Sequence, residues 1–251
     1  MINAIKQLSL AAADLLLPRH CVVSGRALDS SEPGVVAPEV LREISVGGPD
    51  YCIRCGDTLG AGIGAVSECV SCRDNKQGFS TKQMISVGQY EWPLENICKA
   101  LKFGGERRAA EAAALMLTQL LFERDVVEKI DLVIPVPLHI LRHFRRGYNQ
   151  AEEIASRVAK IIDKPLNIQM LQRPDPTKRQ ARLSRAQRKS NVKGAFSVRE
   201  GVSLKGQTVL LIDDIMTTGA TFGAAAKALK KAGAKTVYGA IAARASLDSD
   251  T

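Results

Sequence analysis

Hydrophobic and polar positions follow two alternating periods along residues 83–244. Continuous apolar runs rich in β-branched residues predict strands at 83–90, 131–136, 195–198, 208–212 and 236–242. Apolar residues at helical spacing predict helices over 107–122, 151–162 and 222–229. Strands that are apolar throughout are buried on both faces, and here they alternate with helices. The pattern therefore predicts an α/β fold with a doubly wound, mostly parallel sheet.

Residues 1–80 lack this regularity beyond one N-terminal helix, and they are punctuated by Gly, Pro and Cys. We expect a small module over 1–80 followed by the α/β domain over 81–251. The apolar stretch Leu8–Leu17 is interrupted by Ser9 and Asp14, which makes it a poor signal peptide and favours a short docking helix. No apolar run reaches the roughly 18 to 20 residues of a membrane span, so none is expected.

Four of the six cysteines form two C-x-x-C pairs, Cys52/Cys55 and Cys69/Cys72. Two such knuckles present four thiolates, a set suited to tetrahedral Zn²⁺. The alternatives are two disulfides or four unrelated thiols. A closed four-cysteine site leaves no position for substrate, so its zinc would be structural, and zinc-bound reduced thiols favour a cytoplasmic location. Cys98 is expected to be a buried thiol under a helix.

The net charge of +9 and pI of 9.4 come from two local stretches. Segment 171–200 holds nine basic and two acidic residues, a net charge of +7, and segment 139–148 adds +3. The remainder sums to −1. A near-neutral body with two basic stretches indicates local anion sites rather than a generally basic surface.

The most informative chemistry follows the apolar run 208–212. Asp213 and Asp214 come at its end, where open α/β sheets bind ligands. The residues that come next combine hydroxyls, a small turn residue and a helix start, which is typical of a phosphate cradle; they are Thr217, Thr218, Gly219, Ala220 and Thr221. Carboxylates beside a phosphate site can accept hydrogen bonds from a vicinal diol. The pattern therefore predicts a phosphorylated ribose as the ligand.

Two other interpretations fit this stretch less well. A helix N-cap box needs one capping residue, whereas this stretch carries two acids and three threonines. The P-loop and dinucleotide-binding glycine motifs are absent from the sequence.

The stretch 209–221 resembles the binding motif for 5-phosphoribosyl-1-pyrophosphate (PRPP) of type I phosphoribosyltransferases. Further segments resemble the ComF family of phosphoribosyltransferase-like proteins, linked to competence and DNA uptake; they are Leu101–Gly104, Ile134–His139 with Arg142, and Arg146–Gln150. The series from Thr177 to Phe196 and the cysteine-bearing module resemble the same family, whose members often carry a double zinc ribbon. Here Cys21 lacks a C-x-x-C partner, so we expect one zinc, held by the four paired cysteines.

The resemblance assigns roles by position. It implies that Asp213 and Asp214 bind the ribose hydroxyls, and that residues 217–221 bind the 5′-phosphate. The pyrophosphate, with Mg²⁺, would be met by a loop comprising Pro137, Leu138, His139, Arg142, Arg145 and Arg146. A hood loop would close over the ligand with Gln180, Arg182, Arg185 and Arg188. A solvated surface is the alternative for the arginines of the pyrophosphate loop.

Two functions follow as hypotheses. The first is transfer of a phosphoribosyl group from PRPP to an acceptor, with Mg²⁺-assisted release of pyrophosphate. The second is a competence or DNA-uptake factor that binds single-stranded DNA, using the fold for PRPP sensing or nucleic-acid handling, with competence-machinery proteins as partners. The +7 stretch exceeds what one pyrophosphate needs, which favours DNA, while an aromatic content of 4% gives little support for base stacking. Neither the acceptor nor the oligomeric state is indicated.

Overall fold

The computed structural model describes residues 19–29, 32, 34–44, 46–74, 80–138, 146–173 and 195–245. Within these ranges, two short helices precede the sheet, α2 (Pro38–Glu43) and α3 (Val70–Asp74). The later helices are α4 (Leu94–Phe103), α5 (Ala109–Glu123), the 3-10 turn η1 (Val127–Lys129), α7 (Gln150–Ile161) and α9 (Ala220–Lys231). No helix in these ranges is long and apolar enough to cross a membrane.

The central sheet has four parallel strands in the order β1-β6-β5-β2, which confirms the predicted fold class. These strands are β1 (Gln83–Gln89), β2 (Leu132–Pro135), β5 (Thr208–Met216) and β6 (Thr236–Arg244). Beyond β2, Val133 pairs in parallel with Leu166, which continues the sheet by one bridge. A separate antiparallel pair is formed by β3 (Leu171–Gln172) and β4 (Ser197–Val198).

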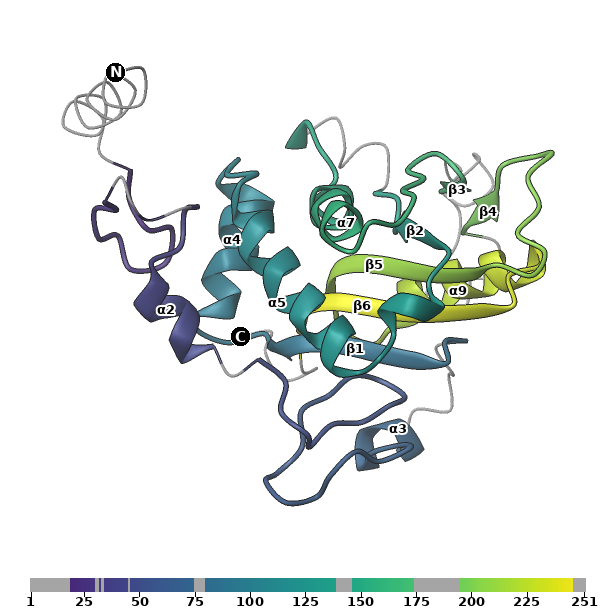
Figure 1. The fold of residues 1–251 in the computed structure, drawn as a ribbon, viewed down its shortest axis with the longest axis horizontal. Coiled ribbons are helices and arrows are strands. Elements are labelled where there is room, and N and C mark those ends of the chain that lie inside the picture. The colour runs from purple at the N-terminus through teal and green to yellow at the C-terminus, as the bar shows by residue number, and fades with distance from the viewer. Residues whose placement is uncertain are drawn as a thin grey trace, which may run out of the picture.

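Helices cover both faces of this sheet, with α4, α5 and α7 on one and α9 on the other (Figure 1). The strands supply alternate side chains to two cores, as the two-residue period requires. Leu210 and Ile212 of β5 lie in the core under α4, α5 and α7, whereas Val209 and Leu211 lie in the core shared with α9. Each core is therefore built from every second residue of the same apolar strands.

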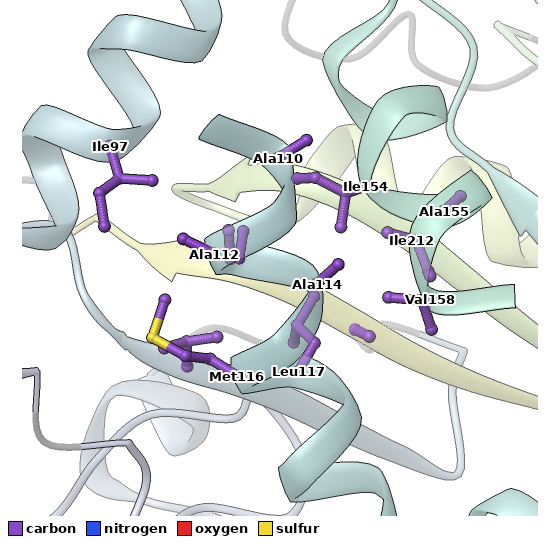
Figure 2. Close-up of a cluster of buried hydrophobic side chains, with 14 of the residues drawn as sticks. Ile97, Ala110, Ala112, Ala114, Met116, Leu117, Ile154, Ala155, Val158 and Ile212 are labelled. Atoms are coloured by element: carbon purple, nitrogen blue, oxygen red, sulfur yellow. The ribbon is translucent and has the colours of Figure 1, made fainter. Parts of the chain in front are cut away.

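Small residues let the helices on the first face pack closely. Ala110 and Ala114 of α5 lie on the side facing Ile154 and Val158 of α7, as Figure 2 shows. Helix α4 is not among the elements expected from the sequence. It packs against α5 and buries Cys98, which lies on the helix itself and is 3% exposed.

The N-terminal segments protect the free edge of β1. The Ile53 carbonyl accepts a hydrogen bond from Met84 N–H at 2.9 Å, and Gly47 N–H donates to the Val87 carbonyl at 3.1 Å. Arg124, at the end of α5, stacks its guanidinium 3.7 Å from the ring centroid of Tyr51. An unprotected edge strand invites pairing with another chain. The cysteine-bearing segment therefore closes the sheet on this side.

Gly239 of β6 lies where the sheet contacts α9 most closely. A Cβ there would sit 2.1 Å from Met84 Sδ and 2.8 Å from Phe222 Cε1, so a methyl group overfills the core. We expect Gly239→Ala to destabilise the protein by about 1–3 kcal/mol, because both neighbours must shift. Chemical denaturation measures this, with Gly48→Ala as the matched control because no atom lies within 4 Å of its Cβ position. Equal stability of the two variants would contradict the close packing.

Candidate functional site

The two acidic residues stand at the carboxyl end of β5, between β2 and β6. The sequence suggested that both acids follow the strand. The strand continues to Met216, so both acids lie within it. Asp213 pairs in register with Ile241 of β6. It lies on the same face of β5 as Leu211, which packs in the core shared with α9. Its Oδ1 accepts a hydrogen bond from Asp214 N–H at 2.9 Å. The strand thus fixes the position of this carboxylate.

The charges of the two carboxylates affect different neighbours. Burial raises the pKa of Asp213 well above its usual range, the adjacent Asp214 raises it further, and Arg173 offsets part of the effect. Burial also raises the pKa of Cys98 and of Tyr90, and the charge of Asp214 adds to both. Asp214 is therefore close to the α4 side of the sheet, and Asp213 is within electrostatic reach of Arg173.

A hollow lies between the end of β5 and the start of α9. Its lining consists of Asp213, Ile215, Met216, Thr217, Thr218, Gly219, Ala220, Thr221 and Phe222. Gly219 is the N-cap of α9, with a left-handed backbone at φ 73°, and it contributes no side-chain cap. The first turn of α9 carries no acid, so the positive end of the helix dipole is not neutralised there. This arrangement suits an anion better than the N-cap box that the sequence left as an alternative.

Arg244 is a residue of this site that the sequence motifs did not indicate. It ends β6 in register with Met216, and its guanidinium donates a hydrogen bond to the Thr217 carbonyl. Ala245 N–H also donates to the Met216 carbonyl at 2.9 Å. These contacts brace the threonine loop from the neighbouring strand. Only the parallel pairing of β5 with β6 brings them together.

Part of the expected pyrophosphate loop is described. Pro137 and Leu138 follow β2, and Val136 N–H donates to the Ile212 carbonyl at 2.8 Å, next to Asp213. Arg146 donates to Gln150 Oε1 at 3.0 Å, with Gln150 1% exposed. His139, Arg142 and Arg145 lie outside the described residues.

Asn149 joins the start of α7 to this loop. Its Nδ2 donates to the Val136 carbonyl at 3.0 Å, while its Oδ1 caps α7 by accepting from Ala151 N–H at 3.2 Å. The side chain is buried, so both contacts are shielded from water. Asn149 and Gln150 were noted in the sequence only as part of a motif, and the structure gives each a contact beside the loop.

The expected hood residues Gln180, Arg182, Arg185 and Arg188 also lie outside the described residues. The two ends of that segment are fixed by the ladder of β3 and β4, in which Leu171 pairs with Val198. Arg173 follows β3, with its guanidinium 5.3 Å from the ring centroid of Phe196. The charge of Arg173 acts on Asp213, so the segment starts beside the acidic pair.

The four paired cysteines come together in one buried cluster, and all six cysteines of the chain are free of disulfides. The Sγ atoms of Cys52 and Cys72 are 3.8 Å apart, and those of Cys55 and Cys69 are 3.7 Å apart. Tetrahedral zinc with Zn–S bonds of about 2.3 Å requires sulfur separations of about 3.8 Å. The cluster therefore has the dimensions and ligand set of a structural zinc site.

Cys21 lies apart from this cluster. Its Sγ accepts hydrogen bonds from Ala37 N–H at 3.3 Å and from Ser24 N–H at 3.5 Å, and the residue is 2% exposed. The nearby Arg26 pairs with Glu32 and Glu39. Among the described residues, the four paired cysteines form the single group of three or more metal-binding side chains.

Comparison with known proteins agrees with the geometry. Residues 104–246 match the model of the phosphoribosyl transferase domain. Competence protein F of Haemophilus influenzae is 31% identical over 191 residues, covering 74% of this chain and 81% of that protein. The DNA utilization protein YhgH of Salmonella typhi is 32% identical and covers 74% of this chain and 80% of its own length. Competence protein ComFC of Streptococcus pneumoniae is 30% identical, with 61% and 64% covered. The chain therefore belongs to the ComF family of proteins with a type I phosphoribosyltransferase domain.

Proposed function

We propose that the hollow at the end of β5 binds PRPP and that the protein transfers its phosphoribosyl group to an acceptor. One observation carries this proposal: the Asp213 carboxylate and the start of α9, whose N-cap residue Gly219 gives no side-chain cap, line the same hollow. Asp213 and Asp214 would accept hydrogen bonds from the ribose hydroxyls. The N–H groups at the start of α9 and the hydroxyls of Thr217, Thr218 and Thr221 would bind the 5′-phosphate.

The pyrophosphate would lie toward the loop after β2, because β2 is the strand beside β5. Among the described residues, Arg146 is then the cation that would bind the leaving group, and Gln150 orients its guanidinium. The carboxylate and phosphate oxygens at this edge fit Mg²⁺, which prefers oxygen ligands. Bound there, Mg²⁺ would neutralise charge that develops on the departing pyrophosphate.

The chain's own contribution is positioning and electrostatics. Asp213 and Asp214 hold the sugar, the start of α9 holds the phosphate, and the cations stabilise the leaving group. The bond between C1 and the pyrophosphate oxygen breaks, and the acceptor forms the new bond at C1. Among the described residues lining the hollow, Asp213 is the single carboxylate, and it is assigned to the ribose hydroxyls. The proton that the acceptor loses would therefore pass to the departing pyrophosphate.

Binding is tested by calorimetric titration of Mg²⁺·PRPP into the wild type and Gly219→Val. The valine places a branched side chain at a left-handed position inside the phosphate cradle, so we expect affinity to fall by at least 10-fold. Gly206→Val is the matched control. Gly206 has the same backbone handedness, φ 82°, but it precedes β5 and so lies at the other end of that strand from the hollow. Both variants bear similar strain, about 1–2 kcal/mol, yet only the first should lose PRPP. Equal binding by both variants, or no binding by the wild type, contradicts the assignment.

Transfer is tested separately by pyrophosphate release across nucleobases, amines and single-stranded DNA. Release with one acceptor supports a transferase, and PRPP binding with no release supports a sensor.

The second candidate function is nucleic-acid handling, favoured by relatives named competence protein F and DNA utilization protein YhgH. It would involve single-stranded DNA and competence proteins as partners. The reduced cysteine cluster suits the cytoplasm for either function.

A further inference from the structure

Phe103 is an aromatic side chain that the fold leaves in solvent. It ends helix α4 and is 72% exposed, the largest value among the exposed large hydrophobic residues in the described ranges. A single exposed apolar residue is ordinary on its own. What sets Phe103 apart is the pair of cations beside its ring.

Two positively charged side chains flank this ring from different parts of the chain. Lys102 Nζ lies 5.2 Å from the ring centroid, and the Arg146 guanidinium carbon lies 5.5 Å from it. Both distances are within the range of cation–π attraction. In the part of the chain that the structure describes, neither cation forms an ion pair with a carboxylate. Their charge is therefore available to a ligand.

Hydrogen bonds fix this position relative to the carboxyl edge of the sheet. Tyr148, two residues after Arg146, donates from its hydroxyl to the Leu101 carbonyl, which joins the end of α4 to the start of α7. Asn149 then joins α7 to Val136 at the end of β2. These hydrogen bonds therefore hold the ring and its two cations near the carboxyl ends of the strands, where the acid pair also lies.

We propose, resting on the second candidate function above, that Phe103 with Lys102 and Arg146 is a stacking platform for one base of a single-stranded nucleic acid. An exposed aromatic ring can stack with a base, and the two cations beside it would meet the neighbouring phosphates. The exposure of the ring favours a polymer over a free base, because small ligands need an enclosing pocket for affinity. Duplex DNA is excluded as the ligand, since its bases are already stacked on one another.

The test is fluorescence anisotropy with a labelled oligo(dT), in the absence of PRPP and Mg²⁺. Phe103→Ala is expected to weaken binding about 5- to 150-fold, the range for one lost base-stacking contact. Phe103→Trp keeps an aromatic face and should bind as tightly as the wild type. Phe122→Ala is the matched control, because Phe122 is also exposed, at 53%, and no cation of the described residues lies over its ring. Truncating an exposed side chain should change stability by less than about 0.5 kcal/mol, which thermal melting checks.

An abasic oligonucleotide of the same length separates stacking from charge. It should bind the wild type and Phe103→Ala equally, because it offers phosphates without bases. The platform is disproved if Phe103→Ala binds oligo(dT) like the wild type, or if Phe122→Ala loses as much affinity. If dTMP competed at the same concentration as oligo(dT), the ring would bind a free nucleotide, and the proposal of a polymeric ligand would be wrong. Because PRPP is absent, failure here leaves the PRPP assignment untouched, and the Gly219→Val experiment is equally independent of it.

Discussion

Replacing Cys52 or Cys72 with Ser is expected to abolish metal binding and to unfold the segment that the four cysteines hold together. The sulfur separations of 3.7 and 3.8 Å match a zinc tetrahedron. Structural zinc contributes about 10–16 kcal/mol of apparent binding free energy in small peptides. Much of that energy here would fold residues 46–74, whose described secondary structure is limited to the short helix α3 and isolated bridges.

The measurement is zinc content by mass spectrometry together with thermal melting, before and after chelation. We expect one zinc per chain in the wild type and none in Cys52→Ser. Cys21→Ser is the matched control, because Cys21 is equally buried but lies outside the cluster, and a serine oxygen can accept the same backbone hydrogen bonds. Two zinc ions per chain, or zinc lost from Cys21→Ser, would contradict a single four-cysteine site.

Loss of the metal should also expose the edge of β1. Met84 N–H is paired to the Ile53 carbonyl, and Ile53 lies between Cys52 and Cys55. Once that segment unfolds, the free edge of a hydrophobic strand becomes available to other chains. We therefore expect the zinc-free protein to aggregate, which light scattering detects, while the Cys21→Ser protein remains monodisperse.

The four strands of the central sheet and the cysteine cluster were predictable because their signals are local, whereas the two-residue strand β3 lies in a segment expected to be a loop. Continuous apolar runs mark strands buried on both faces, and C-x-x-C spacing marks paired ligands. Helix α4 escaped prediction although Leu94, Ile97, Cys98 and Leu101 have helical spacing, because the stripe is only ten residues long and is bounded by Pro93 and Gly104. The length of β5 was also underestimated: charged residues usually end a buried strand, and this one carries Asp213 and Asp214 inside it.

The remaining features depend on which strands become neighbours. Arg244 reaches the threonine loop only because β6 pairs with β5, and no spacing in the sequence encodes that pairing. Phe103 and Arg146 meet because α4 ends close to the point where α7 begins. Residue type suggested an anion site for Arg146, whereas its position over an aromatic ring required the fold.

Asp213→Asn is expected to weaken PRPP binding while making the ligand-free protein more stable. Burial and the adjacent Asp214 raise the pKa of Asp213, so its ionised form is disfavoured in the folded state. Asparagine removes that charge, and its Oδ1 can still accept the hydrogen bond from Asp214 N–H. Hydrogen bonds to charged groups contribute about 1.5–3 kcal/mol, so the loss of the carboxylate should weaken PRPP binding roughly 10- to 150-fold.

The sign of the pH dependence follows from the same shift. A group whose pKa is higher in the folded state contributes stability that is fully present below its unfolded pKa, about 3.9, and is lost as pH rises through its folded pKa. As pH rises above the unfolded value, Asp213 therefore costs stability relative to a neutral side chain, and the asparagine variant avoids that cost. Single stabilising substitutions commonly add about 0.5–2 kcal/mol, and each kcal/mol raises the melting temperature by about 2–4 °C in a protein of this size.

Two measurements decide this prediction: melting temperature against pH without ligand, and PRPP affinity by calorimetry at neutral pH. The difference in stability between wild type and Asp213→Asn should widen as pH rises from 4 and then level off. Asp131→Asn is the control, because Asp131 is exposed at the amino end of β5, where its Oδ2 accepts from Thr208 N–H at 2.8 Å. That variant should bind PRPP normally and gain no stability. If Asp213→Asn bound PRPP like the wild type, the carboxylate would have no part in ligand binding, and its burial would need another explanation.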